Sequence, residues 1–559
     1  MDSPHTAQEK HAPSTVPSTA PSTPVDRASN ANIAEKTEYD DATNPASGDE
    51  YIRGTRLVIV SVSLMLAMFL VSLDNTVIST AIPKITDEFQ DITSVSWYGS
   101  AYFLTFGGFQ STFGKVYKYF PIKLWFLIAL GIFEVGSLLC AIAQELTLLI
   151  VGRAIAGLGG AGVSTGIFTT IGLSVPPNQR PALLGYVGST YGVGAVLGPL
   201  LGGVFTDKVS WRWCFYINLP VGGVAVAIFI FFFRAAGKPV EAPLKEKLLQ
   251  LDLGGTVLIM GMIICYVLAL QYGGQTHPWN SGTVIGLLVA FALILIIFIA
   301  WEIFQKDRAM IVPRLFMKRY VLTGSIFVFF FGGAYFAVLY YLPIYFQSVH
   351  DMSAISSGVR MLAFIIPLII AIIAQGPAFM KVGIAPLFWV IGGAVSAIGC
   401  GLLYTMDGDT STGKWIGFQI LVGFAFGWTY QIAIENAQVQ TSQEDMSQTT
   451  AIVNFFAIIG GSFFNAAAQA AFNNQIVNHV TATLPDVDVA LVLGTGATSI
   501  REVFSAAQTP VIIDAYVLGL KAVFAITIAL CGISTIIGVF GSWKRIKVED
   551  DSKPVGGAI

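Results

Sequence analysis

The sequence predicts an all-α integral membrane protein, and three observations lead to this prediction. Hydrophobic residues make up 54% of the 559 residues and charged residues only 12%, about half the charged share of a soluble protein. From Tyr51 onward, apolar stretches recur that are about 20 residues long, which is the length of a helix that crosses a bilayer. These stretches lack strand-like alternation, and lipid tolerates no open sheet edge.

Fourteen membrane-spanning helices are expected from these stretches. Each is a run of apolar residues bounded by polar or charged residues. The expected helices lie at about 57–80, 95–114, 124–143, 146–172, 182–204, 214–233, 253–271, 282–303, 321–347, 357–379, 385–405, 415–435, 448–472 and 514–541.

Lysine and arginine are distributed unevenly between the two sides of this arrangement. With the N-terminus placed in the cytoplasm, most of the 31 Lys and Arg residues fall in cytoplasmic segments. This agrees with the positive-inside rule for membrane proteins. An even number of helices returns the chain to the same side, so we expect both termini to be cytoplasmic.

A faint internal repeat and shifts in composition divide the chain. The segment 114–125 is similar to the segment 376–389, and duplicated halves are typical of secondary transporters. The polar, proline-rich start of the chain favours disorder. The expected parts are a disordered cytoplasmic tail (1–50), a six-helix bundle (51–233), an inserted helical hairpin with cytoplasmic linkers (234–320), a second six-helix bundle (321–541) with a long outer segment (473–513), and a cytoplasmic tail (542–559).

Ionisable residues inside apolar stretches are the first candidates for function, because charges in hydrocarbon are costly. Asp74 is either a proton-binding carboxylate or a structural hydrogen-bonding group near a helix end. Arg153 cannot deprotonate and needs a partner, for which Asp74 is the natural candidate. Glu134 is either a proton site or a fixed hydrogen bond, whereas Glu435 lies near a helix end and is interpreted as an interfacial charge.

A glycine-rich helix is expected at 182–204. Gly194, Gly198 and Gly202 recur every four residues, which leaves one helix face without side chains and lets another helix approach closely. Pro199 removes a backbone donor and bends the helix. The run is either a hinge or seal that decides the direction of access, or a tight packing surface. It comprises Gly188, Gly192, Gly194, Gly198, Pro199, Gly202 and Gly203.

Aromatic and amide side chains recur in several of the expected helices. Together they are typical of a cavity for a mostly apolar, polycyclic solute. The alternative is that they make helix–helix contacts and interfacial aromatic belts. The expected cavity residues are Asn75, Tyr98, Tyr340, Tyr345, Trp428, Gln431 and Asn454.

Several classes of function are disfavoured. The five His and five Cys residues are scattered, so no metal site is expected. A phosphate-binding G-x-x-x-x-G-K-[ST] loop is absent from the sequence, and no nucleophile–base arrangement supports an enzyme. A net charge of −3 argues against a nucleic-acid partner. We therefore expect no cofactor and a proton gradient as the energy source.

Six stretches resemble motifs of the major facilitator superfamily, and within it of the fourteen-helix drug:proton antiporters. The general motifs are LDNTVISTAIPKI (73–85), LIVGRAIAGLGGAG (149–162), GAVLGPLLGG (194–203) and WRWCFYINLPVG (211–222). Two others (268–281 and 340–359) are similar to fungal toxin and multidrug efflux members. The resemblance implies the major facilitator fold, with two pseudo-symmetric six-helix bundles and an inserted hairpin, and it gives Arg153 a role in proton transfer.

One loop departs from the family pattern. The inner-loop motif covers Gly114, Lys115, Lys118 and Lys123. Lys118 stands where the family carries an Asp, and Pro121 stands where a Gly is usual. The ion pair that is usual for this loop is therefore in doubt, and we expect a different contact to close the inner gate.

The resemblance implies proton-coupled efflux of a hydrophobic small molecule, such as a fungal secondary metabolite, mycotoxin or drug. Protonation of Asp74, tuned by Arg153, would return the carrier. The expected partners are this solute, protons and the lipid bilayer, and a monomer is sufficient. The plasma membrane is the expected location, with the vacuolar membrane as an alternative. Alternative functions are proton-coupled or facilitative import of a nutrient or siderophore-like solute, and a non-transporting receptor or scaffold.

Overall fold

Long helices make up the described part of the protein. The computed structural model describes residues 51–89, 95–234, 239–495, 497 and 499–546. Within these ranges the regular structure is helical, apart from an isolated bridge between Gly273 and His277. The predicted disordered tail (1–50) and most of the predicted C-terminal tail (542–559) lie outside the described residues.

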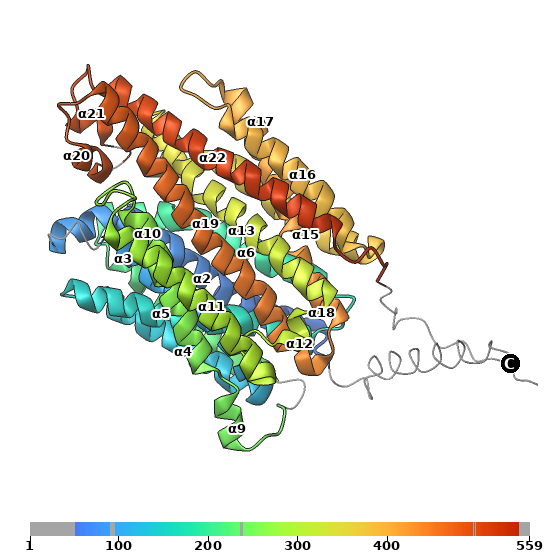
Figure 1. Cartoon of the computed structure of the whole chain (residues 1–559). Helices are drawn as coiled ribbons and strands as arrows, with labels where there is room; N and C mark the ends of the chain where they lie inside the picture. The colour runs from blue at the N-terminus through green and yellow to red at the C-terminus, as the bar shows by residue number, and fades with distance from the viewer. Residues whose placement is uncertain (1–50, 90–94, 235–238, 496, 498, 547–559) are drawn as a thin grey trace, which may run out of the picture. The chain divides into compact units, whose positions relative to one another are not determined.

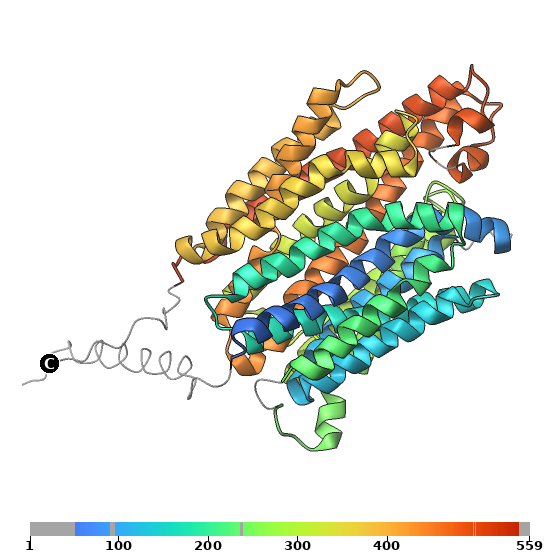
Figure 2. The same ribbon diagram turned by 180° about the vertical axis from the view of Figure 1, so that it is seen from behind.

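The helices of the first bundle lie at the spans expected from the apolar stretches, and α2, α3 and α6 continue several residues beyond them. Helix α4 packs against α5, and α2 packs against α6. The helices α2 and α6 run side by side in Figure 2, blue beside teal-green. The helices are α2 (Gly54–Phe89), α3 (Val95–Tyr119), α4 (Ile122–Ala141), α5 (Leu146–Ser174), α6 (Arg180–Lys208), α7 (Trp213–Tyr216) and α8 (Asn218–Phe232).

An inserted hairpin follows the first bundle. Asp252 and Ser281 cap its two long helices, each accepting a hydrogen bond from a backbone N–H of the first turn. Its first long helix packs against α3 of the first bundle and α19 of the second (Figure 1). The insert comprises α9 (Leu244–Leu249), α10 (Leu253–Tyr272), α11 (Gly282–Gln305), η1 (Lys306–Arg308) and α12 (Pro313–Phe316).

The second bundle repeats the pairings of the first. Helix α13 packs on α19 as α2 packs on α6, and α15 packs on α17 as α3 packs on α5. The bundles meet through α3 against α19 and through α6 against α15. The elements are α13 (Arg319–Ser348), α14 (Ala354–Arg360), α15 (Leu362–Val382), α16 (Ala385–Tyr404), α17 (Thr412–Thr429), α18 (Ile432–Gln440), η2 (Gln443–Asp445), α19 (Met446–Thr483), α20 (Val489–Gly494), α21 (Ile500–Val503) and α22 (Thr509–Val539).

Thirteen helices in the described ranges are long and apolar enough to cross a membrane, against the fourteen expected. The expected helix at 95–114 is present as α3, but its composition is too polar to be counted among the thirteen. Helices α5, α10 and α19 surround α3. A helix shielded from lipid by its neighbours can carry more glycine and hydroxyl side chains than a lipid-facing one.

The outer segment 473–513 is more ordered than its composition suggests. Helix α19 continues to Thr483, and the short helices α20 and α21 follow it. Arg501 of α21 donates hydrogen bonds to the backbone carbonyls of Ser348 and Val349 and pairs with Asp351. This end of the bundle, with Arg501 and α20, is called the cap end below.

Candidate functional site

A buried ion pair joins α2 to α5. The Arg153 Nη1 atom donates to Asp74 Oδ2 at 2.5 Å, and both side chains are almost completely buried. Arg153 Nε donates to the backbone carbonyl of Tyr98 at 2.9 Å, and the guanidinium lies 4.5 Å from the centre of the Tyr102 ring. The pairing expected from the sequence is therefore confirmed, although neither residue's role is tested by this geometry.

An amide on α8 completes the surroundings of Asp74. Asn218 Nδ2 donates to Asp74 Oδ1 at 3.1 Å and to the Ser137 hydroxyl at 3.0 Å. Asp74 thus has one cationic and one neutral partner, contributed by two different helices. Asn218 lies within the stretch 211–222 that the sequence singled out as a motif, but it was not singled out as a partner of Asp74.

Glu134 lies on α4, one turn from Ser137. Its two carboxylate oxygens are buried without a hydrogen-bond partner among the described residues. A Cβ atom placed on Gly222 of α8 would lie 1.8 Å from Glu134 Oε1, so a larger residue there would displace the carboxyl group from this position. Ser137, one turn further along α4, accepts a hydrogen bond from Asn218, which also donates to Asp74.

The glycines of α6 form the close contact that their spacing predicted. Cβ atoms on Gly194, Gly198 and Gly202 would lie 2.7 Å, 2.0 Å and 2.3 Å from side-chain atoms of Ser72, Thr76 and Thr80 on α2. The other members of the run differ from these three. A Cβ on Gly188 would clash with the Gln431 amide, whereas Gly192 and Gly203 have only ordinary contacts, and Pro199 lies inside the helix.

A central cavity lies between the two bundles. Helices of both bundles supply its walls, which are aromatic and aliphatic with a few neutral polar groups and no charged side chain. Gln431 and Asn454 line it as expected from the sequence, and Gly188 of the glycine-rich run lines it as well. Asn454 Nδ2 also donates to Ser164 Oγ across the bundles. Its further lining residues are Met68, Val71, Phe106, Phe168, Tyr191, Tyr335, Phe336, Leu368, Ile372, Phe426, Gly427, Tyr430, Ile434 and Ile458.

Four residues expected in the cavity do not line it. Asn75 is buried and forms a side-chain hydrogen bond with Tyr191 of the cavity wall, and Tyr98 is buried where its backbone carbonyl accepts from Arg153. The Tyr345 hydroxyl donates to the backbone carbonyl of Asp407 near the cap end. The Trp428 ring stacks on Phe388 and Phe424, away from both cavities. Amino-acid type does not report which face of a helix points inward, and these four side chains do not line either cavity in this conformation.

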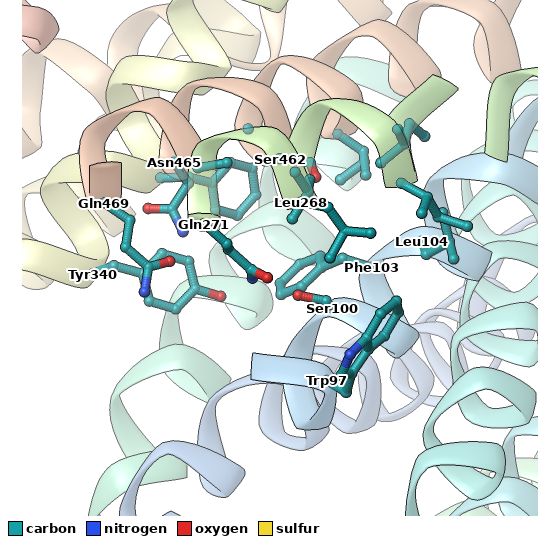
Figure 3. Close-up of a pocket in the computed structure, with 17 residues that line it drawn as sticks. Trp97, Ser100, Phe103, Leu104, Leu268, Gln271, Tyr340, Ser462, Asn465 and Gln469 are labelled. Carbon is teal, nitrogen blue, oxygen red and sulfur yellow. The ribbon is translucent and has the colours of Figure 1, made fainter. Parts of the chain in front are cut away.

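A second cavity, called the lateral cavity, lies among α3, α10, α13 and α19 (Figure 3). Tyr340, expected in a substrate cavity, lines this one. Its walls also carry no charged side chain. The lining residues are Trp97, Ser100, Phe103, Leu104, Ile263, Ile264, Val267, Leu268, Gln271, Phe336, Tyr340, Ile458, Gly461, Ser462, Asn465, Ala466 and Gln469.

An ion-pair cluster joins the bundles at the end opposite the cap. Lys118 Nζ lies 2.8 Å from Asp445 Oδ1, and Arg314 Nη1 lies 3.0 Å from Asp445 Oδ2. Asp445 directly precedes α19, where an acidic side chain also interacts favourably with the helix dipole. We call Lys118, Arg314 and Asp445 the latch, and this end of the bundle the latch end. The sequence predicted a different contact here but did not identify Asp445 or Arg314.

The other residues of the inner-loop motif also make contacts at the latch end. A Cβ on Gly114 would lie 2.4 Å from the Ala451 Cβ, so α3 and α19 cross here at close range. Lys115 Nζ donates to Gln250 Oε1 and to the Asp307 carbonyl, which ties α3 to the insert. Lys123 Nζ donates to two carbonyls at the end of α8, one of them that of Phe233.

Glu435 is not the interfacial charge that its sequence position suggested. It is completely buried on α18, and Gln375 Nε2 of α15 donates to both of its carboxylate oxygens at 2.8 Å. It lies one helical turn from Gln431 in the central cavity.

Comparisons with known proteins agree with this architecture. The family model described as Major Facilitator Superfamily matches residues 64–465. The protein named "Probable efflux pump gsfJ" of Penicillium aethiopicum is 58% identical over 100% of both chains. The "MFS-type transporter grgE" of Penicillium sp is 51% identical, over 92% of this chain and 91% of its own. The crystal structure of the human organic anion transporter MFSD10 (TETRAN) covers 86% of this chain and 100% of its own, with a TM-score of 0.54 at 11% identity, which reflects a common fold.

Proposed function

The chain belongs to the major facilitator superfamily, and we propose that this multi-pass membrane transporter exports a neutral hydrophobic molecule in exchange for protons. The observation that carries the proposal is the buried pair of Asp74 and Arg153. A carboxylate inside an apolar bundle is retained at a cost in stability, and proton relays in transporters are built from such groups.

The walls of both cavities support the class of solute. Aromatic and aliphatic side chains dominate them, and the polar groups are amides and hydroxyls. A charged solute would lose its hydration there without gaining a counter-charge. A neutral, mostly apolar ring system with a few hydrogen-bonding groups fits these walls, and a secondary metabolite, mycotoxin or drug is a solute of this class.

The direction of transport rests on the relatives. The efflux pump from Penicillium aethiopicum aligns with the full chain. We place the latch end in the cytoplasm because the lysine-rich insert linkers lie there. The latch then closes the cytoplasmic side in this conformation. We further propose the plasma membrane as the location and a monomer as the working unit.

The proposed cycle depends on whether the Asp74 carboxyl group is ionised or protonated. When ionised, the carboxylate neutralises Arg153; when protonated, it releases that charge, and the contacts between α2 and α5 change. One proton moving down a potential of 100 mV supplies about 2.3 kcal/mol. With a pH gradient added, this is enough to concentrate a solute more than about tenfold.

Reconstituted liposomes with a trapped pH dye test this proposal. A gradient of each compound from a panel of neutral lipophilic metabolites and drugs is imposed on wild-type and Asp74→Asn protein. We expect at least one compound to drive protons in the opposite direction through the wild type only. Protons that move with the solute would overturn export in favour of import. Absence of proton movement across the whole panel would overturn proton coupling.

A further inference from the structure

We propose that the lateral cavity is a second binding site for the exported molecule, built with the inserted hairpin and placed between the central cavity and the cap end. This inference rests on the proposed function, because it assigns the same solute to a second site. The cavity lies on the seam where α3 of the first bundle meets α19 of the second.

The insert supplies one wall of this cavity. Five residues of α10 line it, and α10 packs against both α3 and α19. Without α10, the seam between the bundles would be open along this wall. The hairpin therefore does more than connect the bundles, because it encloses space beside their interface. These five residues are Ile263, Ile264, Val267, Leu268 and Gln271.

Polar groups converge at one end of the lateral cavity. Figure 3 shows the side chains of Gln271, Asn465, Gln469 and Tyr340 gathered on one side of the cavity, whereas Trp97 lies on the other side. Asn465 Oδ1 is buried without a hydrogen-bond partner among the described residues. A buried amide oxygen normally has a partner, and a ligand hydroxyl or N–H group would supply one. The cavity thus selects a neutral ring system that carries a hydrogen-bond donor.

A thin partition separates the two cavities. Phe336 of α13 and Ile458 of α19 line both of them. A Cβ on Gly461 would lie 2.4 Å from the Phe336 ring, so glycine at this position makes room for the ring. A solute that leaves the central cavity reaches the lateral cavity once these two side chains move. The two cavities therefore form consecutive sites on one route.

Binding stoichiometry tests the proposal on the purified full-length protein in lipid nanodiscs. The probe is 1-hydroxypyrene, a neutral polycyclic phenol with a free hydroxyl group, and bound probe is counted by equilibrium dialysis. Leu268→Trp fills the lateral cavity from α10. Val257→Trp places the same side chain on the same helix at a position that is 70% exposed, and it is the matched control. We expect two bound molecules in the wild type and the control, and one in Leu268→Trp.

Milder variants guard against misfolding of the tryptophan variant. Asn465→Leu and Gln271→Leu remove the polar groups with little change in volume, and each is expected to weaken the second site at least about fivefold while the first is unchanged. Equal binding stoichiometry in Leu268→Trp and the control would overturn the proposal of a lateral site. An affinity of the second site that is unchanged in both leucine variants would overturn it as well. So would a phospholipid that mass spectrometry finds in the wild type but not in Leu268→Trp while probe binding is equal. The liposome assay separates these results from failure of the proposed function, because proton exchange by the wild type does not require a second site.

Discussion

At the scale of single residues, the partners of Arg153 explain how a charge is kept inside the bundle. Its guanidinium has a carboxylate, a backbone carbonyl and an aromatic ring around it. A guanidinium stays charged in proteins, so any proton that moves here is carried by Asp74. Asn218 holds the second carboxylate oxygen of Asp74, which fixes the carboxyl group in place.

Replacing Asp74 by Asn should abolish proton exchange and reduce stability. The variant leaves the buried Arg153 charge without a counter-ion, and loss of one member of a buried pair costs about 3–5 kcal/mol. Thermal unfolding in nanodiscs measures stability, and the pH dye measures exchange. Asn218→Asp is the companion variant, because it places a second carboxylate beside Asp74. Proton exchange by Asp74→Asn at the wild-type rate would exclude Asp74 from the proton path.

The exposed ion pair of Glu88 and Arg212 should contribute to stability in a way that depends on pH. Glu88 lies beyond the apolar span Gly54–Ile78 of α2. Hydrogen bonds from Arg212 and Trp211 lower the pKa of its carboxyl group. Since the folded-state pKa lies below the unfolded value of about 4.3, the pair stabilises the protein above that pH, and the contribution is lost as the pH falls through the folded-state value. Unfolding temperatures of Glu88→Gln and wild type should differ at pH 7 and converge near pH 3. A constant difference would contradict this account.

At the scale of elements, the approach of α6 to α2 depends on which glycine faces the neighbour. Gly202 and Gly203 are adjacent in the sequence but point in different directions. A Cβ on Gly202 would lie 2.6 Å from the Val77 carbonyl, which is backbone and cannot rotate away. The nearest atom to a Cβ on Gly203 is 3.9 Å away, on Ile355 of the second bundle.

This pair of glycines offers a matched test. Gly202→Ala should destabilise the protein by about 1–3 kcal/mol, because it overpacks the contact between α6 and α2. Gly203→Ala should be neutral or slightly stabilising, since alanine is the better helix former. Thermal unfolding of both variants in the same nanodiscs measures the difference. Equal unfolding temperatures would show that the close contact is not rigid.

At the scale of the whole molecule, the latch and the cavities describe one conformation. The bundles are joined by ion pairs at the latch end and contain two cavities between the latch and the cap. Lys118 takes the place of the acidic residue that is usual in its loop, and Asp445 supplies the negative charge from the other bundle instead. The charge on α3 is therefore basic instead of acidic, but an ion pair still joins α3 to the start of α19.

Asp445→Asn should open the latch end. It removes the charge that holds both Lys118 and Arg314, and the two cations then repel each other. Ser447→Cys, 2% exposed at the start of α19, reports opening through its reaction rate with a polar maleimide. We expect the rate to rise several-fold in Asp445→Asn. Glu444→Gln is the control, since Glu444 is an exposed neighbour with one longer contact to Lys118, at 3.5 Å. An unchanged labelling rate in Asp445→Asn would mean that packing alone closes this end.

Most of the helices could be predicted because hydrophobicity is a local property. The expected span 253–271 differs by one residue from α10, and 385–405 differs by one from α16. The pairing of Asp74 with Arg153 was also predictable, because both are charged residues in apolar stretches and each needs a partner. The spacing of glycines in α6 likewise indicated a close helix contact before any partner was known.

Other features arise between segments that are far apart in the chain. Lys118 and Asp445 are 327 residues apart, and the unusual lysine in its loop does not by itself indicate which acidic residue it meets. The burial of Glu435, the outward position of Trp428 and the lateral cavity all depend on how helices rotate and which neighbours cover them. Composition and spacing therefore determine which segments enter the membrane and which of their charges need partners. The faces that meet, and the cavities left between them, are set only when α3, α10 and α19 pack together, because side-chain shape acts at contact distance and leaves no pattern within a single helix.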